Sequence, residues 1–198
     1  EIWTRVIEKV NLYTGWNWVS FISGGLSTSE MAGSLEEARS QTSLIINDPD
    51  WGLFGNLDWM DSYEAYKIKM KEEAEVLEYI LMEGGAMNEN GYVDDKILEH
   101  GWNWVSYPYE YEYYVADIFD ATQFNEGDII LSKEDGMVTL TEGAWEGNLI
   151  NLIPNQGYLI YSNTEGEYSV TMPNRYTLKQ GSFQSEAQSA PNRDRSVW

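Results

Sequence analysis

The chain has no cysteine and a single histidine, and these two absences remove several kinds of site. Without cysteine it has no disulfides, thiolate zinc sites or cysteine nucleophiles. One histidine, His100, leaves no multi-histidine metal site, and we expect a surface or capping role for it rather than that of a catalytic base. No run of 18 apolar residues occurs in the 198 residues, so we predict no insertion into a membrane.

Basic residues are also scarce. Lysine and arginine together number 12, against 33 aspartates and glutamates, which gives a formal net charge of −21. Binding of phosphate backbones and anionic lipid depends on lysine and arginine, so we predict that nucleic acid is not a partner. With so many carboxylates, acid pairs are inevitable, and their number does not indicate a glycoside hydrolase.

What the chain does contain is an internal repeat. The motif Gly-Trp-Asn-Trp-Val-Ser occurs at residues 15–20 and again at 101–106. Tryptophan is rare, so an identity with two tryptophans indicates duplication of a whole module. Active sites are usually single, so the duplication favours a binding or structural role. Later matches agree with it: Gly55-Asn56-Leu57 with Gly147-Asn148-Leu149, and Tyr66 with Tyr158.

The repeat predicts two domains of roughly ninety residues, a size that can hold a core of its own. We place the first module at residues 1–83 and the second module at 93–174. A glycine- and asparagine-rich linker occupies 84–92. Residues 175–198 are polar and predict a flexible tail or the start of a following domain.

Hydrophobic spacing indicates mainly strands. In 16–21, Trp16 and Trp18 share one face of a predicted strand, and further strands are predicted around Tyr66 and Tyr158. Leu35 and Ala38 belong to a spacing of three and four that predicts a short amphipathic helix within 27–40. The spacing of apolar residues in 115–121 predicts the equivalent short helix in the second module. The predicted fold is therefore β-dominated α+β, with two homologous small sheet or sandwich modules, each with one short helix.

These motifs resemble a tandem module of large surface-exposed or secreted proteins of Bacteroidetes. The motifs that carry the resemblance are Gly-Trp-Asn-Trp, Glu126-Gly127-Asp128-Ile129-Ile130, Gly147-Asn148-Leu149 and Pro154-Asn155-Gln156-Gly157-Tyr158. It spans roughly residues 11–173, and the first copy departs from it at Ser34-Leu35-Glu36 and at Ser62-Tyr63-Glu64-Ala65. The resemblance implies a β-rich repeat at the cell surface or outside the cell, beside adhesion or glycan-handling domains of the same polypeptide. It implies no catalytic residues.

Aromatic residues are the candidate ligand contacts, because tryptophan and tyrosine rings stack on flat sugar faces. In an extended chain Tyr109, Tyr111 and Tyr113 share one face, and the first copy has no such stripe. The stripe is therefore a candidate contact surface, or else it covers the boundary between the modules. Trp51, Trp59 and Trp145 lie near turns and are further candidates. Core packing is the simpler explanation of the motif tryptophans Trp16, Trp18, Trp102 and Trp104.

Two acidic clusters offer oxygen ligands for Ca²⁺: Asn88, Asn90, Asp94 and Asp95, and separately Asp48, Asp50, Asp58 and Asp61. Neither has the spacing of an EF-hand loop. We expect ordinary solvated turns, and we predict no cofactor.

The sequence thus favours a non-catalytic, extracellular module of a surface or secreted multidomain protein. We predict that it binds polysaccharide or a glycoconjugate through exposed aromatics. The alternative is a structural spacer or adhesin module with no small ligand. An enzyme is the least favoured class.

Overall fold

The computed structural model describes residues 7–22, 25–72, 77–82, 95–173 and 178. The predicted linker at 84–92 lies outside these residues. Of the predicted tail only Leu178 is described, and it packs against the core of the second module. The predicted β-dominated α+β class is confirmed, because antiparallel strands dominate and the helices are short.

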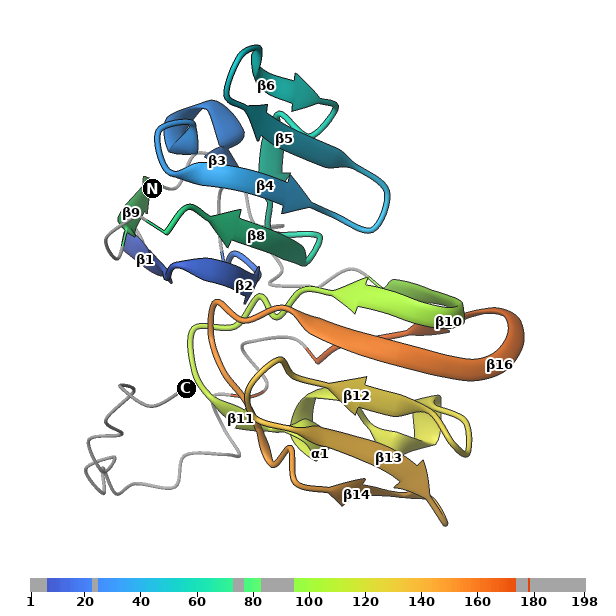
Figure 1. The fold of residues 1–198 in the computed structure, drawn as a ribbon. Coiled ribbons are helices and arrows are strands. Elements are labelled where there is room, and N and C mark those ends of the chain that lie inside the picture. Colours follow the sequence, from blue (N-terminus) through green and yellow to red (C-terminus); the bar gives the residue numbers. More distant parts are fainter. Residues whose placement is uncertain (1–6, 23–24, 73–76, 83–94, 174–177, 179–198) are drawn as a thin grey trace, which may run out of the picture.

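Both modules carry a five-stranded antiparallel sheet, and the strand order is the same in each (Figure 1). The order is β2-β8-β4-β5-β6 in the first module and β10-β16-β12-β13-β14 in the second. The first sheet contains β2 (Gly15–Val19), β4 (Leu35–Arg39), β5 (Leu44–Asp48), β6 (Gly52–Gly55) and β8 (Tyr66–Met70). The second contains β10 (Lys96–Val105), β12 (Ile129–Leu131), β13 (Met137–Thr141), β14 (Ala144–Gly147) and β16 (Tyr158–Val170).

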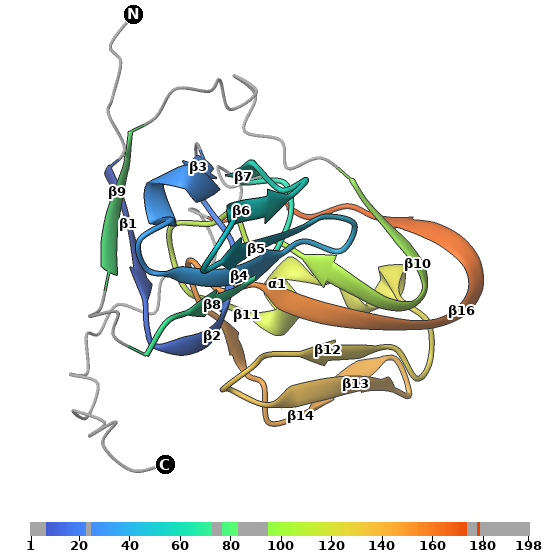
Figure 2. The same ribbon diagram turned by 45° about the horizontal axis from the view of Figure 1, so that its top comes forward.

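Short two-stranded sheets complete the modules. They pair β3 (Gly25–Ser27) with β7 (Trp59–Asp61), β11 (Tyr113–Tyr114) with β15 (Asn151–Leu152), and β1 (Ile7–Leu12) with β9 (Leu77–Met82). The second module needs no separate equivalent of β1 and β9, since β10 and β16 are long enough to pair there as well, from Lys96 to Glu99. Figure 2 shows β10 and β16 curving together at the side of the second module.

The helix predicted within residues 27–40 is wrong beyond its first turn. Only η1 (Thr28–Met31), a 3₁₀ turn, is helical, and β4 follows it. Leu35 and Ala38 are both buried because the register of β4 shifts between Leu35 and Glu37. A β-bulge of this kind turns a spacing of two into a spacing of three, which imitates a helix. The helix predicted at 115–121 is present as α1 (Val115–Ile118), followed by the 3₁₀ turn η2 (Ala121–Gln123).

The repeated motif builds the same bend at the entry to each sheet. Gly15 and Gly101 have φ of +81° and +94°, a conformation that favours glycine. Two residues later, the Oδ1 atom of Asn17 accepts a hydrogen bond from the Tyr13 amide at 2.9 Å, and its Nδ2 donates to the Tyr13 carbonyl at 2.7 Å. Asn103 makes the equivalent pair of bonds with Glu99, both at 2.8 Å. Each buried amide thus ties the bend to the strand before it.

A separate hydrophobic core lies under each sheet. The first includes Phe21, Leu26, Leu35, Met60 and Ile68, and the second includes Tyr107, Phe119, Ile130, Leu152 and Ile160. None of the four motif tryptophans belongs to either core. The expectation that core packing explains them is therefore wrong. They point to the opposite face of their strands from the buried Val19 and Val105.

The modules meet through equivalent parts of the two copies. Val19 forms a β-bridge with Gln156, and Val105 forms one with Glu64. Val105 is the repeat equivalent of Val19, and Gln156 is the repeat equivalent of Glu64. An approximate two-fold axis therefore relates the two bridges, so the tandem pair resembles a symmetric dimer within one chain.

Side chains near this axis hold the modules together. The Ser20 hydroxyl donates to the Gln156 carbonyl at 2.7 Å, and the equivalent hydroxyl of Ser106 donates to the Tyr63 carbonyl at 3.1 Å. The Lys67 ammonium lies 4.4 Å from the ring centroids of both Trp18 and Trp104. One cation therefore bridges a tryptophan of each module.

We expect the bend to be sensitive to loss of its amide. Asn103→Ala removes the partner of the Glu99 backbone amide and carbonyl, so the free energy of unfolding should fall by about 2 kcal/mol or more. Chemical denaturation measures this change. Asn11→Ala, an exposed asparagine on β1, serves as the control and should change the unfolding free energy little. Equal effects for the two variants would contradict the role of the amide.

The junction should be sensitive to volume at Gly157. A Cβ there would lie 2.8 Å from the Val19 carbonyl oxygen and 3.0 Å from the Ala65 Cβ. Gly157→Val should therefore lower the free energy of unfolding by about 1–3 kcal/mol and loosen the pair, which solution scattering would show as a larger radius of gyration. Gly33→Ala is the control, since a Cβ at that glycine meets nothing within 4 Å. An unchanged radius in Gly157→Val would mean that the modules do not pack closely here.

Candidate functional site

The structure does not bring the predicted tyrosine stripe to the surface. Tyr109 is 1% exposed and Tyr113 is 6% exposed, so their prediction as exposed stacking platforms is wrong. The ring centroids of Tyr109 and Tyr113 lie 5.9 Å apart, and those of Tyr107 and Tyr109 lie 5.1 Å apart. Residues 107–112 form no strand, so the alternation expected of an extended chain does not apply. These tyrosines fill the second core, and only Tyr111 of the predicted stripe is exposed.

The three further candidates have different surroundings. Trp145 is half-buried, packs against the second core and donates from its indole nitrogen to the Phe119 carbonyl at 2.7 Å. Trp51 follows β5 in a turn and is 86% exposed. Trp59 lies on β7 and is 55% exposed. The structure therefore presents Trp51, Trp59 and Tyr111 to solvent.

The Trp59 ring packs directly against a glycine. A Cβ at Gly25 would lie 2.5 Å from the indole nitrogen of Trp59 and 2.6 Å from its Cε2. The indole thus rests on glycine backbone, where any other residue would push it away. A ring that is packed from below and open above is held in position before a ligand arrives, which lowers the entropy cost of binding.

The second module shows that the fold does not require this arrangement. The β11–β15 pair corresponds to β3–β7, with Tyr114 opposite Asn151 where Ser27 lies opposite Trp59. By the same correspondence Glu112 replaces Gly25. The Asn151 amide donates to the Glu112 carboxylate at 2.6 Å. Both members of the glycine–tryptophan pair are therefore exchanged together for a polar pair on the same backbone.

The motif tryptophans contribute two more partly exposed rings at equivalent places. Trp16 lies beside the Arg39 guanidinium, 5.9 Å from the ring centroid, and Trp102 packs edge-on against Tyr161 at 5.2 Å. The neighbours of these rings thus differ between the modules, while the tryptophans are retained. They lie on the outer face of each sheet, away from its core.

The predicted acidic clusters do not assemble a metal site in the described part of the chain. No group of three or more His, Cys, Asp or Glu side chains that could hold a metal occurs there. The Asp48 carboxylate instead accepts hydrogen bonds from the amides of Asp50 and Trp51 in its own turn. Asn88, Asn90 and Asp94 lie outside the described residues. His100 is exposed, as predicted, and its Nδ1 lies 3.2 Å from the Thr164 carbonyl oxygen.

No family model, curated protein or solved structure matches this chain. Among the helices of the described residues, none has the length and apolar character needed to traverse a lipid bilayer.

In the sequence, Trp59 is a candidate only because it lies near a turn, and no local pattern points to Gly25. A signal was available in the repeat: at the matched positions one copy has glycine and tryptophan, and the other has glutamate and asparagine. This exchange can be recognised only once the strand pairing is known, because the sequence offset between the copies changes by several residues along the chain.

Burial of the tyrosine hydroxyls predicts alkaline instability. Burial raises the pKa of Tyr66, Tyr107 and Tyr158 well above the ordinary value of 10.0. The unfolded chain then loses these protons at lower pH than the folded chain, so the stability they contribute is intact below pH 10 and declines as the pH rises above it. Denaturation at pH 8, 10 and 11 should show this fall.

Absorbance at 295 nm provides the matching measurement. Tyr66, Tyr107 and Tyr158 should ionise only when the protein unfolds. Ionisation of these three tyrosines near pH 10, with circular dichroism unchanged, would contradict the burial.

Proposed function

We propose that this protein is a non-catalytic glycan-binding module and that Trp59 is its principal stacking platform. The observation that carries the proposal is the seating of the Trp59 indole on Gly25, present in one copy and replaced in the other. A rigid ring with an open face suits the C–H-rich face of a sugar. The resemblance to modules of Bacteroidetes surface and secreted proteins supports an extracellular or cell-surface location, with polysaccharide or glycoconjugate as ligand.

One stacking ring contributes a limited free energy of binding. Aromatic contacts contribute roughly 0.5–1.5 kcal/mol beyond the burial of their area. A single platform therefore gives weak affinity, and most of the gain from Trp59 lies in a ring that needs no reordering on binding. Trp51 and Tyr111 are exposed as well, and we assign them secondary roles.

A structural spacer is the second candidate, and a different observation favours it. The paired bridges at Val19 and Val105, with the Lys67 ammonium between two indoles, join the modules closely. A joined pair keeps a fixed spacing between whatever flanks it. This role does not require an exposed indole, so the two functions separate experimentally at Trp59.

Affinity electrophoresis in gels that contain xylan, mixed-linkage β-glucan, galactomannan, mannan or polygalacturonate tests the proposal. We expect retardation in at least one gel. Trp59→Ala should weaken that retardation by about tenfold, the scale of one lost stacking contact. Gly25→Ala should weaken it as well, because the added methyl group would meet both the Met60 carbonyl oxygen and the indole at 2.5 Å.

Tyr114→Ala is the matched control, since Tyr114 is an exposed aromatic on the corresponding sheet of the second module. It should bind as the native protein does, and thermal melts should confirm that every variant is folded. Unchanged retardation in Trp59→Ala would refute the platform. The absence of retardation in every gel would leave the spacer as the better account.

A further inference from the structure

The approximate two-fold axis relates two junctions between the modules. The side-chain contacts at these two junctions differ. At the junction beside Val105, the Lys96 ammonium donates to the Tyr63 carbonyl at 2.7 Å. The Trp104 amide donates there to the Gln41 side chain at 2.8 Å. These two contacts fasten the second module's β10 to loops of the first module.

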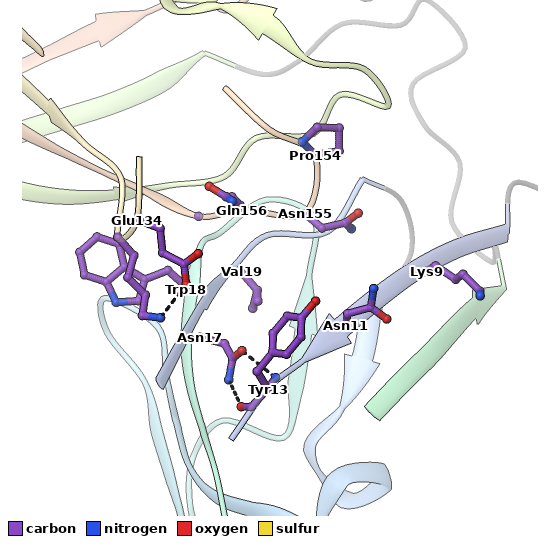
Figure 3. A pocket seen from close by; sticks show the side chains of 12 residues that line it. Lys9, Asn11, Tyr13, Asn17, Trp18, Val19, Glu134, Pro154, Asn155 and Gln156 are labelled. Carbon is purple, nitrogen blue, oxygen red and sulfur yellow. Dashed lines mark hydrogen bonds and ion pairs between the residues drawn. The ribbon is translucent and has the colours of Figure 1, made fainter. Parts of the chain in front are cut away.

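The junction beside Val19 has different residues at the corresponding places. Lys96 corresponds to Val10, which is buried in the first core, and Gln41 corresponds to Lys133. The two fastening contacts are therefore not repeated here. Backbone hydrogen bonds join the modules instead, from the Ser20 amide to the Asn155 carbonyl at 3.3 Å and from the Gly157 amide to the Trp18 carbonyl at 3.2 Å. A cleft of about 220 Å³ lies here between the modules (Figure 3). Its walls include Asn11, Tyr13 and Trp18 of the first module and Lys133, Asn155 and Gln156 of the second.

The lining combines an aromatic ring with side chains that both donate and accept hydrogen bonds. The amides of Asn11, Asn155 and Gln156 each carry donor and acceptor groups that suit hydroxyls, although the Gln156 oxygen also accepts a bond from the Tyr158 hydroxyl at 3.4 Å. The Tyr13 side chain is 43% exposed and points toward the loop that carries Asn155 (Figure 3). Its backbone is held on both sides by the Asn17 amide, so the bend of the repeated motif also positions this ring.

We propose that this cleft binds a single sugar ring, as a second saccharide site separate from the Trp59 platform. The volume is below the roughly 300–1,000 Å³ of pockets for drug-sized ligands, which fits one ring rather than an oligosaccharide. Amides pair with the hydroxyls, and the Tyr13 ring covers one face. The inference rests on the proposed function in taking the ligand to be a sugar.

The asymmetry of the pair supports the assignment. Glu99 occupies the position of Tyr13 at the junction beside Val105, so the aromatic ring is specific to the junction beside Val19. This cleft of the duplicated scaffold is thus built from both copies. Neither module forms the cleft alone, since its walls come from β1 and β2 on one side and from residues 133–134 and 154–157 on the other.

Two-dimensional ¹H–¹⁵N NMR of the full chain tests the cleft with glucose, galactose, mannose, N-acetylglucosamine, glucuronate and galacturonate as separate probes. At least one probe should shift the Trp18 indole N–H and the side-chain amides of Asn11 and Asn155 in a saturable manner. Tyr13→Ala should weaken that probe by about tenfold, while Trp59→Ala should leave its affinity unchanged.

Glu99→Ala is the matched control at the junction beside Val105 and should bind the probe as the native chain does. The cleft assignment is wrong if no probe shifts these signals, or if Tyr13→Ala binds as tightly as the native chain. Gel retardation that depends on Trp59, together with silent cleft signals, would remove this inference and keep the proposed function. Cleft signals without any gel retardation would keep this inference and remove the Trp59 platform.

Discussion

A buried asparagine amide at the entry to each sheet sets the geometry on which the other features depend. Asn17 and Asn103 bind the backbone four residues earlier and hold a glycine in a conformation that other residues rarely adopt. The bend fixes the phase of the strand that follows, which buries one set of side chains and turns the tryptophans outward. The same amide holds Tyr13 in place. The motif is therefore a device of backbone geometry as well as a source of surface rings.

Comparison of the two copies separates the scaffold from the candidate sites. Features shared by both, such as the bend and the bridges at the two-fold axis, are needed to build any such pair. Features present in one copy on the same backbone are not required by the scaffold that the copies share, although a residue specific to one copy can fill its core, as Tyr109 does. Two candidates belong to the second group. Trp59 on Gly25 is replaced by Asn151 with Glu112 in the other copy, and Tyr13 in the cleft is replaced by Glu99. Both candidates arose where the copies diverged in chemistry and kept their structure.

Much of the architecture was predictable from the sequence, and the misses have identifiable physical causes. The duplication, the β-dominated class and the strands at Tyr66 and Tyr158 follow from repetition and alternation. The bulge in β4 imitated helical spacing, and residues 107–112 left the extended geometry that would have exposed Tyr109. The cleft could not be predicted from the sequence, since its walls come from segments more than a hundred residues apart.

The two-fold contact between the modules also limits how such units can combine. Each module uses the same surface to meet its partner, and the pairing of Val19 with Gln156 and of Val105 with Glu64 occupies that surface on both sides. A head-to-tail contact would leave one vacant surface at each end and could propagate into a filament, whereas this one closes on itself. Longer arrays of these modules would accordingly consist of separate pairs along a polypeptide. The linkers between the pairs would set the length of the array.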